Sequence, residues 1–258
     1  MFYGGRPPVC FTSYVNGSSG TFLTGMIEKM CCPMRKKPIR ITYNNPWNNA
    51  HGTINTNTSS SEDIGYFGSS KDYFKRLTVN NDFDPIFHPT HFYDPYAVLE
   101  RWPNAKIFLV THTLEDAPEI AINSLFKFAL HDVKGFDDQN FQDRISRFFT
   151  EKDNILTAAH YNFKHYGPDE VKTVLEFRKT NLLGAGYWRI NVPDDLKEHV
   201  FEIPYKKIIY DQKWTLDTLT KVLGFPTNNF VENEYANYIN EQKKLFDKID
   251  NFLNKGQT

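Results

Sequence analysis

The chain lacks two features that would each point to a class of protein. Lysine and arginine (30) balance aspartate and glutamate (31), which leaves a formal net charge of −1. Proteins that bind nucleic acids or anionic membranes through bulk charge carry a basic excess, so this balance argues against both partners. No window contains the roughly 18 continuous apolar residues that a membrane span requires, and the mean hydropathy is −0.54. We therefore expect a soluble protein with no nucleic acid and no membrane among its partners.

Cysteine is scarce, and no secretory leader is expected. The three cysteines, Cys10, Cys31 and Cys32, do not have the spacing of a metal site. A small, odd number of cysteines is typical of a reduced intracellular protein rather than of a disulfide scaffold. The first eight residues contain one arginine and no apolar run follows it, so they predict no secretory signal. These features together predict a cytoplasmic protein.

Apolar runs alternate with amphipathic segments along the chain. Residues 8–14 are expected to form a buried strand, and residues 106–111 are a continuous apolar run of the kind that forms a strand buried on both faces. Alternating strands and helices predict a three-layer α/β/α fold with a mainly parallel sheet, in a single domain over residues 1–258. The strands are expected at residues 8–14, 85–92, 106–111 and 199–203, and the helices at residues 21–32, 96–102, 115–131, 140–152, 154–165, 168–181, 215–223 and 232–255.

Two segments are expected to add to this core. Residues 44–70 are rich in Asn, Ser, Thr and Gly and show little periodicity, so we predict a long surface loop or insertion. The C-terminal helix at residues 232–255 carries an apolar stripe, which we expect to pack on the body of the protein. The stripe comprises Tyr238, Leu245, Ile249 and Phe252.

The first strand ends at a turn that leads into a helix. Backbone N–H groups in such a turn can form an anion nest at the positive end of the helix, where parallel sheets bind their ligands. The glycines would let the backbone approach a phosphate or sulfate closely, and the hydroxyl groups would donate to its oxygens. The alternative is a tight turn in which a serine caps the helix. The residues concerned are Asn16, Gly17, Ser18, Ser19, Gly20 and Thr21.

The same turn lacks two nucleotide-binding signatures. No Gly-Lys-Ser/Thr occurs here, so the lysine that neutralises β- and γ-phosphates in ordinary NTPases and kinases is missing. The G-x-G-x-x-G spacing of dinucleotide-binding folds is missing as well.

Four segments along the chain follow the order of landmarks in one enzyme family. They are CFTSYVNGSSGTFL (residues 10–23), PTH (89–91), NAKIFLV (104–110) and YKKIIYDQKWTLDTLTKVLGFP (205–226). Together they resemble the P-loop-like sulfotransferases, which take a sulfuryl group from 3′-phosphoadenylyl sulfate (PAPS). The resemblance implies a P-loop-like sulfotransferase architecture and PAPS as co-substrate, with no metal.

The resemblance also assigns roles to individual residues. The turn at residues 16–21 would cradle the 5′-phosphosulfate end of the donor, and His91 would remove the proton of the acceptor. An unperturbed imidazole titrates near pH ~6.5, so it can accept a hydroxyl proton at neutral pH. The alternative for His91 is a strand-end histidine bonded to a carbonyl group. A zinc site shared with His88 is disfavoured, because residues at this spacing on a strand point to opposite faces.

The chain departs from the family's pattern at two positively charged positions. Many members place a lysine or arginine in the turn, where this chain has Gly17 or Ser18. His112 stands where the family has an arginine that grips the 3′-phosphate together with a serine, and Ser124 is the counterpart of that serine. Neutral imidazole is a poorer partner for an anion than guanidinium. By charge alone, the cations that could compensate are Arg6, Lys127, Arg178, Lys179 and Arg189.

The sequence therefore predicts an enzyme that moves a sulfuryl group from PAPS to a hydroxyl or amine acceptor. A carbohydrate or a small alcohol is the expected acceptor, and the protein would act as a monomer or homodimer. Two other functions stay open. The missing cations suggest a binding or assembly module that keeps the fold without catalysis. A divergent P-loop kinase would bind ATP with Mg²⁺, but no clear acidic residue for the metal follows the strand at residues 106–110.

Overall fold

A parallel sheet forms the centre of the protein. The computed structural model describes residues 8–15, 17–33, 54–55, 78–79, 85–91, 93–131, 135–150, 164–184 and 191–254. The sheet has four strands in the order β4-β1-β5-β6, and every neighbouring pair is parallel. This confirms the predicted α/β class, and each strand overlaps a segment predicted to be extended. The strands are β1 (Val9–Ser13), β4 (Ile86–Thr90), β5 (Lys106–Thr111) and β6 (Val200–Pro204).

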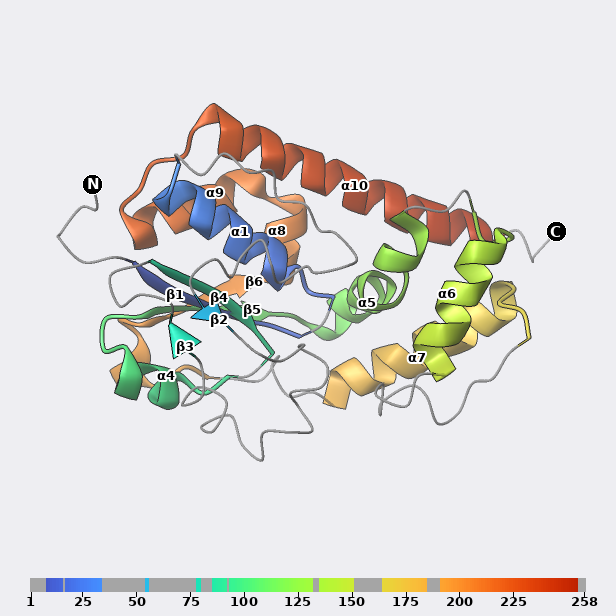
Figure 1. Cartoon of the computed structure of the whole chain (residues 1–258), viewed down its shortest axis with the longest axis horizontal. Helices are drawn as coiled ribbons and strands as arrows, with labels where there is room; N and C mark the ends of the chain where they lie inside the picture. Colours follow the sequence, from blue (N-terminus) through green and yellow to red (C-terminus); the bar gives the residue numbers. More distant parts are fainter. Residues whose placement is uncertain are drawn as a thin grey trace.

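The central strands β1 and β5 are buried on both faces, because successive side chains belong to two different apolar clusters. Cys10 and Phe11 of β1 lie in different clusters, and so do Phe108 and Leu109 of β5. The first cluster includes residues of α1 (Gly20–Cys31), and the second includes residues of α4 (Pro95–Arg101). Figure 1 shows these two helices on opposite sides of the sheet. Continuous apolar strands such as β5 require this double burial.

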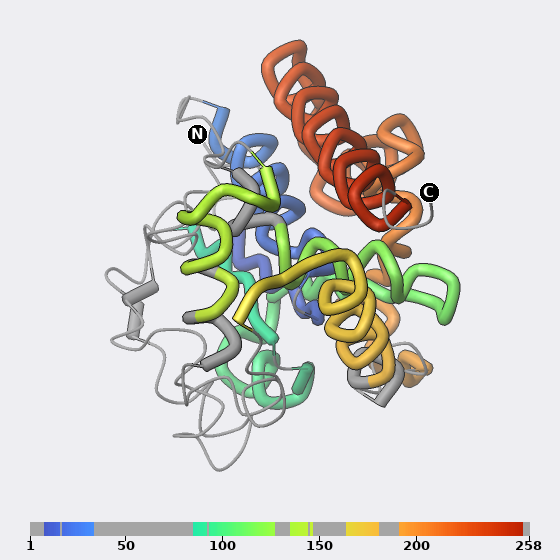
Figure 2. The backbone as a smooth tube through the Cα atoms, turned by 90° about the vertical axis from the view of Figure 1, so that its right-hand side faces the viewer, coloured from blue at the N-terminus to red at the C-terminus, as the bar shows by residue number. Residues whose placement is uncertain are grey.

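The remaining helices cover one face of the sheet and extend beyond one of its ends. α8 and α9 lie on the same side as α1, whereas α6 and α7 both lie at the far end, and each of them contacts α5 (Figures 1 and 2). None of the described helices is long and apolar enough to cross a membrane. Their bounds are α5 (Ala117–His131), α6 (Gln139–Thr150), α7 (Pro168–Gly184), α8 (Tyr205–Tyr210), α9 (Gln212–Leu223) and α10 (Asn229–Asn254), with short 3₁₀ turns at Leu114–Asp116 and Asp194–Leu196.

The sequence did not predict α8. Its residues follow the edge strand β6 directly, and Asp211 then caps α9 by accepting a hydrogen bond from the backbone N–H of Trp214 at 3.0 Å. The helix predicted at residues 154–165 falls almost entirely outside the described residues. So does most of the predicted loop at residues 44–70, although β2 (Ile54–Asn55) within it pairs with β3 (Thr78–Val79).

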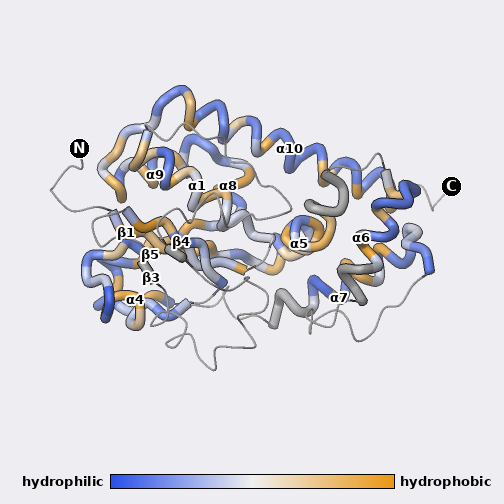
Figure 3. The backbone as a smooth tube through the Cα atoms, in the orientation of Figure 1, coloured by the Kyte–Doolittle hydropathy of each residue, from blue (hydrophilic) through white to orange (hydrophobic). Residues whose placement is uncertain are grey.

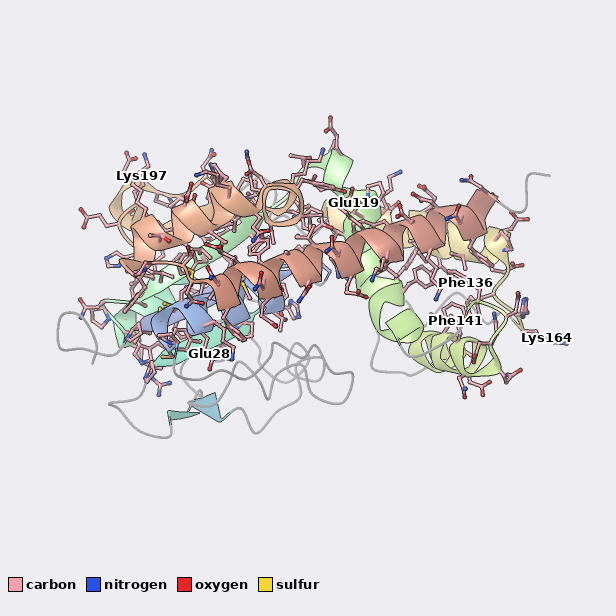
Figure 4. The ribbon with its side chains drawn as sticks, turned by 90° about the horizontal axis from the view of Figure 1, so that it is seen from above. Glu28, Glu119, Phe136, Phe141, Lys164 and Lys197 are labelled. Carbon is pink, nitrogen blue, oxygen red and sulfur yellow. The ribbon has the colours of Figure 1, made fainter. Side chains whose placement is uncertain are left out.

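α10 crosses the molecule and joins its two ends. The predicted apolar stripe is confirmed, because its residues are buried in the large cluster or pack against it. Hydrophilic and hydrophobic residues alternate along α10 (Figure 3), as expected for a helix with one buried side. Phe252, near its C-terminal end, stacks on Phe136 with ring centroids 3.7 Å apart, and Figure 4 shows Phe136 beside that end of the helix. α10 therefore contacts α1, α5, α7 and α8.

Candidate functional site

The strand order identifies the edge of the sheet where a ligand would bind. The connection from β1 leads through α1 to β4 on one side, whereas the connection from β5 leads through α5 towards β6 on the other. In open parallel sheets, ligands bind at the carboxyl ends of neighbouring strands whose connections leave in opposite directions. This point lies between β1 and β5. The glycine- and serine-rich turn follows β1, and His112 follows β5, so both predicted elements lie at this edge.

The backbone of the turn has the geometry of an anion nest. Gly17 has φ +95° and Ser19 has φ +66°, so both adopt the left-handed conformation. Gly20 then starts α1 in the right-handed conformation. Adjacent left- and right-handed residues direct successive N–H groups to the same side, which makes a concavity for an anion at the positive end of the helix.

The turn hydroxyls do not cap the helix as predicted. Ser18 donates both its backbone N–H and its Oγ–H to the carbonyl of Val15, at 3.1 and 2.8 Å. Ser19 occupies the capping position but makes no side-chain capping bond. Its Oγ instead accepts a hydrogen bond from the phenol of Tyr238 at 2.7 Å. The prediction of a capping serine is therefore wrong, because the side chain that should cap α1 contacts α10.

The two glycines are required by contacts within the protein. A Cβ added to Gly17 would lie 2.3 Å from the carbonyl oxygen of Ile120 and 2.9 Å from Cβ of Ser124. A Cβ added to Gly20 would lie 2.0 Å from Cγ of Tyr14. The sequence suggested that these glycines let the backbone approach a ligand closely. In the structure α5 and the ring of Tyr14 occupy the space into which each added Cβ would project, so the turn packs tightly between them.

Ser124 and Arg178 form the link between the turn and the helices beyond the sheet. Ser124, which is 4% exposed, donates to the carbonyl of Ala121 at 3.0 Å and accepts a hydrogen bond from Nε of Arg178 at 3.1 Å. Sequence reasoning included Arg178 among five cations by charge only. The structure brings this one to the serine that the resemblance assigned to phosphate binding.

The charge of Arg178 has no protein counter-charge in the described part of the chain. No described carboxylate pairs with its guanidinium, and burial alone lowers the pKa of Arg178 below its ordinary value. A guanidinium has five N–H donors, and Ser124 uses the one on Nε. Arg178 is partly buried, and its charge and its remaining donors have no described protein partner, so this position is compatible with an anion.

His91 follows β4 and contacts the other side of the turn. Its Nδ1 lies 3.0 Å from the carbonyl oxygen of Tyr14. Because a carbonyl only accepts, Nδ1 carries the proton and the lone pair of the neutral ring is on Nε2. Burial lowers the pKa of His91; the hydrogen bond to Tyr14 opposes this shift, and the charge of Arg178 adds to it. The carbonyl contact of the simpler alternative is therefore present, and it orients the ring as a proton acceptor.

The other predicted residues are placed less fully. His112 follows β5 and is 3% exposed, at the same sheet edge as the turn. Thr21 lies in the first turn of α1, and its Oγ1 is 2.7 Å from the phenol of Tyr14. Asn16 lies outside the described residues. Sequence reasoning missed Tyr14, although it directly follows the strand, and Tyr238, whose contact with Ser19 spans 219 positions.

Neither a cluster of metal ligands in the described ranges nor a similar known protein was found. Within the described ranges, no group of three or more His, Cys, Asp or Glu residues could hold a metal ion. Comparisons of the chain with protein-family models, curated proteins and solved structures found no match. The candidate site therefore depends on its own geometry and on the chemistry of its side chains.

Replacing Gly17 by alanine should destabilise the protein much more than replacing Gly224. Both glycines have positive φ, but a Cβ on Gly224 would meet nothing within 4 Å. Backbone conformation alone costs about 1 kcal/mol, so this is the loss expected for Gly224→Ala. Gly17→Ala adds a clash with α5, for a total of about 3 kcal/mol. Urea unfolding measures both, and equal losses would contradict the packing of the turn on α5.

His91 should titrate below its ordinary pKa of 6.5, with the proton of the neutral ring on Nδ1. Between the folded and unfolded pKa values the unfolded chain binds more protons. The stability contributed by this group is therefore present above pH ~6.5 and is lost as the pH falls through the folded pKa. Nitrogen-15 NMR of the imidazole reports both the tautomer and the pKa.

The variant Arg178→Gln supplies the internal control for this titration. Removing the positive charge should raise the pKa of His91, while the Nδ1–H tautomer stays because Tyr14 still accepts its hydrogen bond. An Nε2–H tautomer in the wild-type protein, or a pKa at or above 6.5, would show that His91 is not oriented and tuned in this way.

Proposed function

We propose that this protein is a sulfotransferase of the P-loop-like type, which moves a sulfuryl group from PAPS to a hydroxyl or amine acceptor. The observation that carries the proposal is the position of Arg178. A partly buried cation with no described carboxylate partner contacts Ser124, which packs against the turn at Gly17. The same cation acts electrostatically on His91. The proposed anion site and the proposed proton acceptor would therefore lie close enough to interact electrostatically.

The turn after β1 supports the binding of a phosphosulfate. Its nest and the N-terminus of α1 offer backbone N–H groups, which suit the dispersed negative charge of a phosphate or sulfate. The order of strand, turn and helix, with the ligand edge between β1 and β5, agrees with the architecture that the sequence resemblance implies. The donor would place its 5′ end here.

Arg178 could replace the cations that the family has in the turn and at the end of β5. The turn has no lysine, and His112 replaces the arginine at the end of β5. Arg178 on α7 supplies a guanidinium to the same region from a different element. Because the hydroxyl proton of Ser124 is directed to Ala121, the guanidinium, and not the serine, would donate to an anion there. The 3′-phosphate of the donor is the group that the resemblance assigns to this place.

The proposed reaction needs a base and correct positioning. Nε2 of His91 takes the proton of the acceptor while its oxygen or nitrogen bonds to sulfur. The bond between sulfur and the bridging oxygen breaks, and the electron pair leaves with 3′-phosphoadenosine 5′-phosphate (PAP). Charge then develops on the leaving phosphate, so donors around it lower the barrier. A neutral His91 at pH 7 is suited to its part, because burial and Arg178 both lower its pKa.

The affinity for PAP should depend on Arg178. We expect micromolar binding of PAP by isothermal titration, without added metal. A hydrogen bond to a charged group contributes about 1.5–3 kcal/mol, so Arg178→Gln should weaken binding roughly 10- to 100-fold. Lys179→Gln is the matched control, because that neighbouring lysine pairs with the exposed Glu176 at 3.3 Å. It should change the affinity by less than about 2-fold.

Three results would contradict the proposal in different ways. Binding of ATP with Mg²⁺ in place of PAP would favour a kinase. Binding of neither nucleotide would leave a module that uses the fold without a donor. Equal losses in Arg178→Gln and Lys179→Gln would mean that Arg178 does not touch the ligand. If PAP binds as expected, His91→Ala should abolish sulfuryl transfer in an acceptor screen of sugars and small alcohols.

A further inference from the structure

Two buried tyrosines contact the two hydroxyl groups that flank the nest. Tyr238 of α10 donates to Oγ of Ser19 at 2.7 Å. The phenol of Tyr14 lies 2.7 Å from Oγ1 of Thr21. Tyr238 is 8% and Tyr14 4% exposed, so neither phenol is available to a ligand directly. Any effect on a bound anion must pass through the serine and the threonine.

We propose that Tyr238 and Tyr14 are positioning residues, each of which donates to a turn hydroxyl so that Ser19 and Thr21 direct their own protons to a bound anion. The anion is the phosphate or sulfate end of the donor, so this inference rests on the proposed function. It adds that buried tyrosines hold the two turn hydroxyls in the orientation in which they donate to the anion. It also adds that α10, through Tyr238, is part of the site that binds PAPS.

The direction of these hydrogen bonds follows from what a hydroxyl can do. A hydroxyl has one proton and two lone pairs. Ser19 accepts from Tyr238, and among the described residues its Oγ has no other hydrogen-bond partner, so its proton remains to be donated. In the pair of Tyr14 and Thr21 either group can donate. An anion accepts only, so it would select the arrangement in which Thr21 faces it as the donor and Tyr14 donates to Thr21.

The surroundings keep both phenols protonated and in place. Burial raises the pKa of Tyr14 and of Tyr238 above the ordinary value, so both remain O–H donors at any physiological pH. The ring of Tyr238 stacks on Phe22 of α1 with centroids 3.6 Å apart and an interplanar angle of 6°. The ring of Tyr14 fills the space beside Gly20 and tilts against His91 with centroids 4.6 Å apart. Packing therefore fixes each hydroxyl before any ligand arrives.

Removal of the Tyr238 hydroxyl should weaken PAP binding, whereas removal of the Tyr235 hydroxyl should not. Tyr235 is a close match, because it lies on α10, contacts Phe22 and donates from a buried phenol to the carbonyl of Ile208 at 2.7 Å. Both Tyr→Phe changes lose one buried hydrogen bond and should lower thermal stability to a similar degree. Only Tyr238→Phe, and likewise Tyr14→Phe, should lower the affinity for PAP, by about 3- to 10-fold.

A double-mutant cycle separates positioning from general loosening of the site. If Tyr238 acts through Ser19, the double variant of Tyr238→Phe and Ser19→Ala should bind PAP as Ser19→Ala does. Additive losses, or an equal loss in Tyr235→Phe, would overturn the positioning role. So would a wild-type affinity in Tyr238→Phe, which would leave the proposed function standing.

Inorganic sulfate is the second probe, and it separates the two proposals. If the wild-type protein binds sulfate but not PAP, and Tyr238→Phe weakens the binding of sulfate, the positioning role holds and the PAPS donor is wrong. If the wild-type protein binds neither sulfate nor PAP, both proposals are overturned. Titration calorimetry of the full chain at fixed ionic strength measures each case.

Discussion

The position of β1 between two parallel neighbours fixes where each part of the candidate site can lie. Ser13 at its end pairs with Thr90 of β4 and Leu109 of β5, so the segments after all three strands leave the sheet at one edge. Tyr14 then donates its backbone N–H to the carbonyl of Thr90 at 3.1 Å, and His91 donates to the carbonyl of Tyr14 at 3.0 Å. The residue just beyond the central strand thereby joins the turn to the proposed base. A shift in strand register would separate them.

Charge is the second constraint, and it is met by a helix outside the sheet. A partly buried guanidinium loses part of its hydration, and a partner compensates for this loss. Ser124 accepts one hydrogen bond from Arg178. The charge of Arg178 and its other N–H donors have no protein partner in the described structure. The same charge disfavours a proton on His91. The positive charge of Arg178 thus favours a bound anion and helps to keep the imidazole of His91 neutral. The proposed reaction needs both effects, because its donor is anionic and its base must be unprotonated.

The composition of short segments predicted the strands of the sheet. It did not predict the contacts between elements that are far apart in the sequence. The four strands of the sheet were located from short extended segments, and β5 most directly, because a continuous apolar run is typical of a strand buried on both faces. The turn was found because it follows β1, whereas His91 was singled out through the resemblance to the sulfotransferases. The expected serine cap was wrong, and the contacts of the two glycines were not predicted, since both depend on what packs against the turn. α5 excludes a side chain at Gly17, and Tyr238 of α10 takes the hydroxyl of Ser19.

One part of the candidate site comes from the edge of the sheet, and the other comes from helices packed beyond it. This explains why the sequence lacks the cations that the sulfotransferase pattern has in the turn and after β5. The sheet edge supplies the turn and His91, whose order along the chain can be recognised from short segments. The helices α5, α7 and α10 supply Ser124, Arg178 and Tyr238, and nothing in the spacing of these residues reveals that they converge. Both positions at which the chain departs from the sulfotransferase pattern lie in the first part, where a cation is missing. The cation near this edge comes from the second part, through the contact of α5 with α7. If the positive charge of the site comes from Arg178 on α7, anion binding depends on the packing of α7 against α5. The missing lysine in the turn is then no evidence against an anion site.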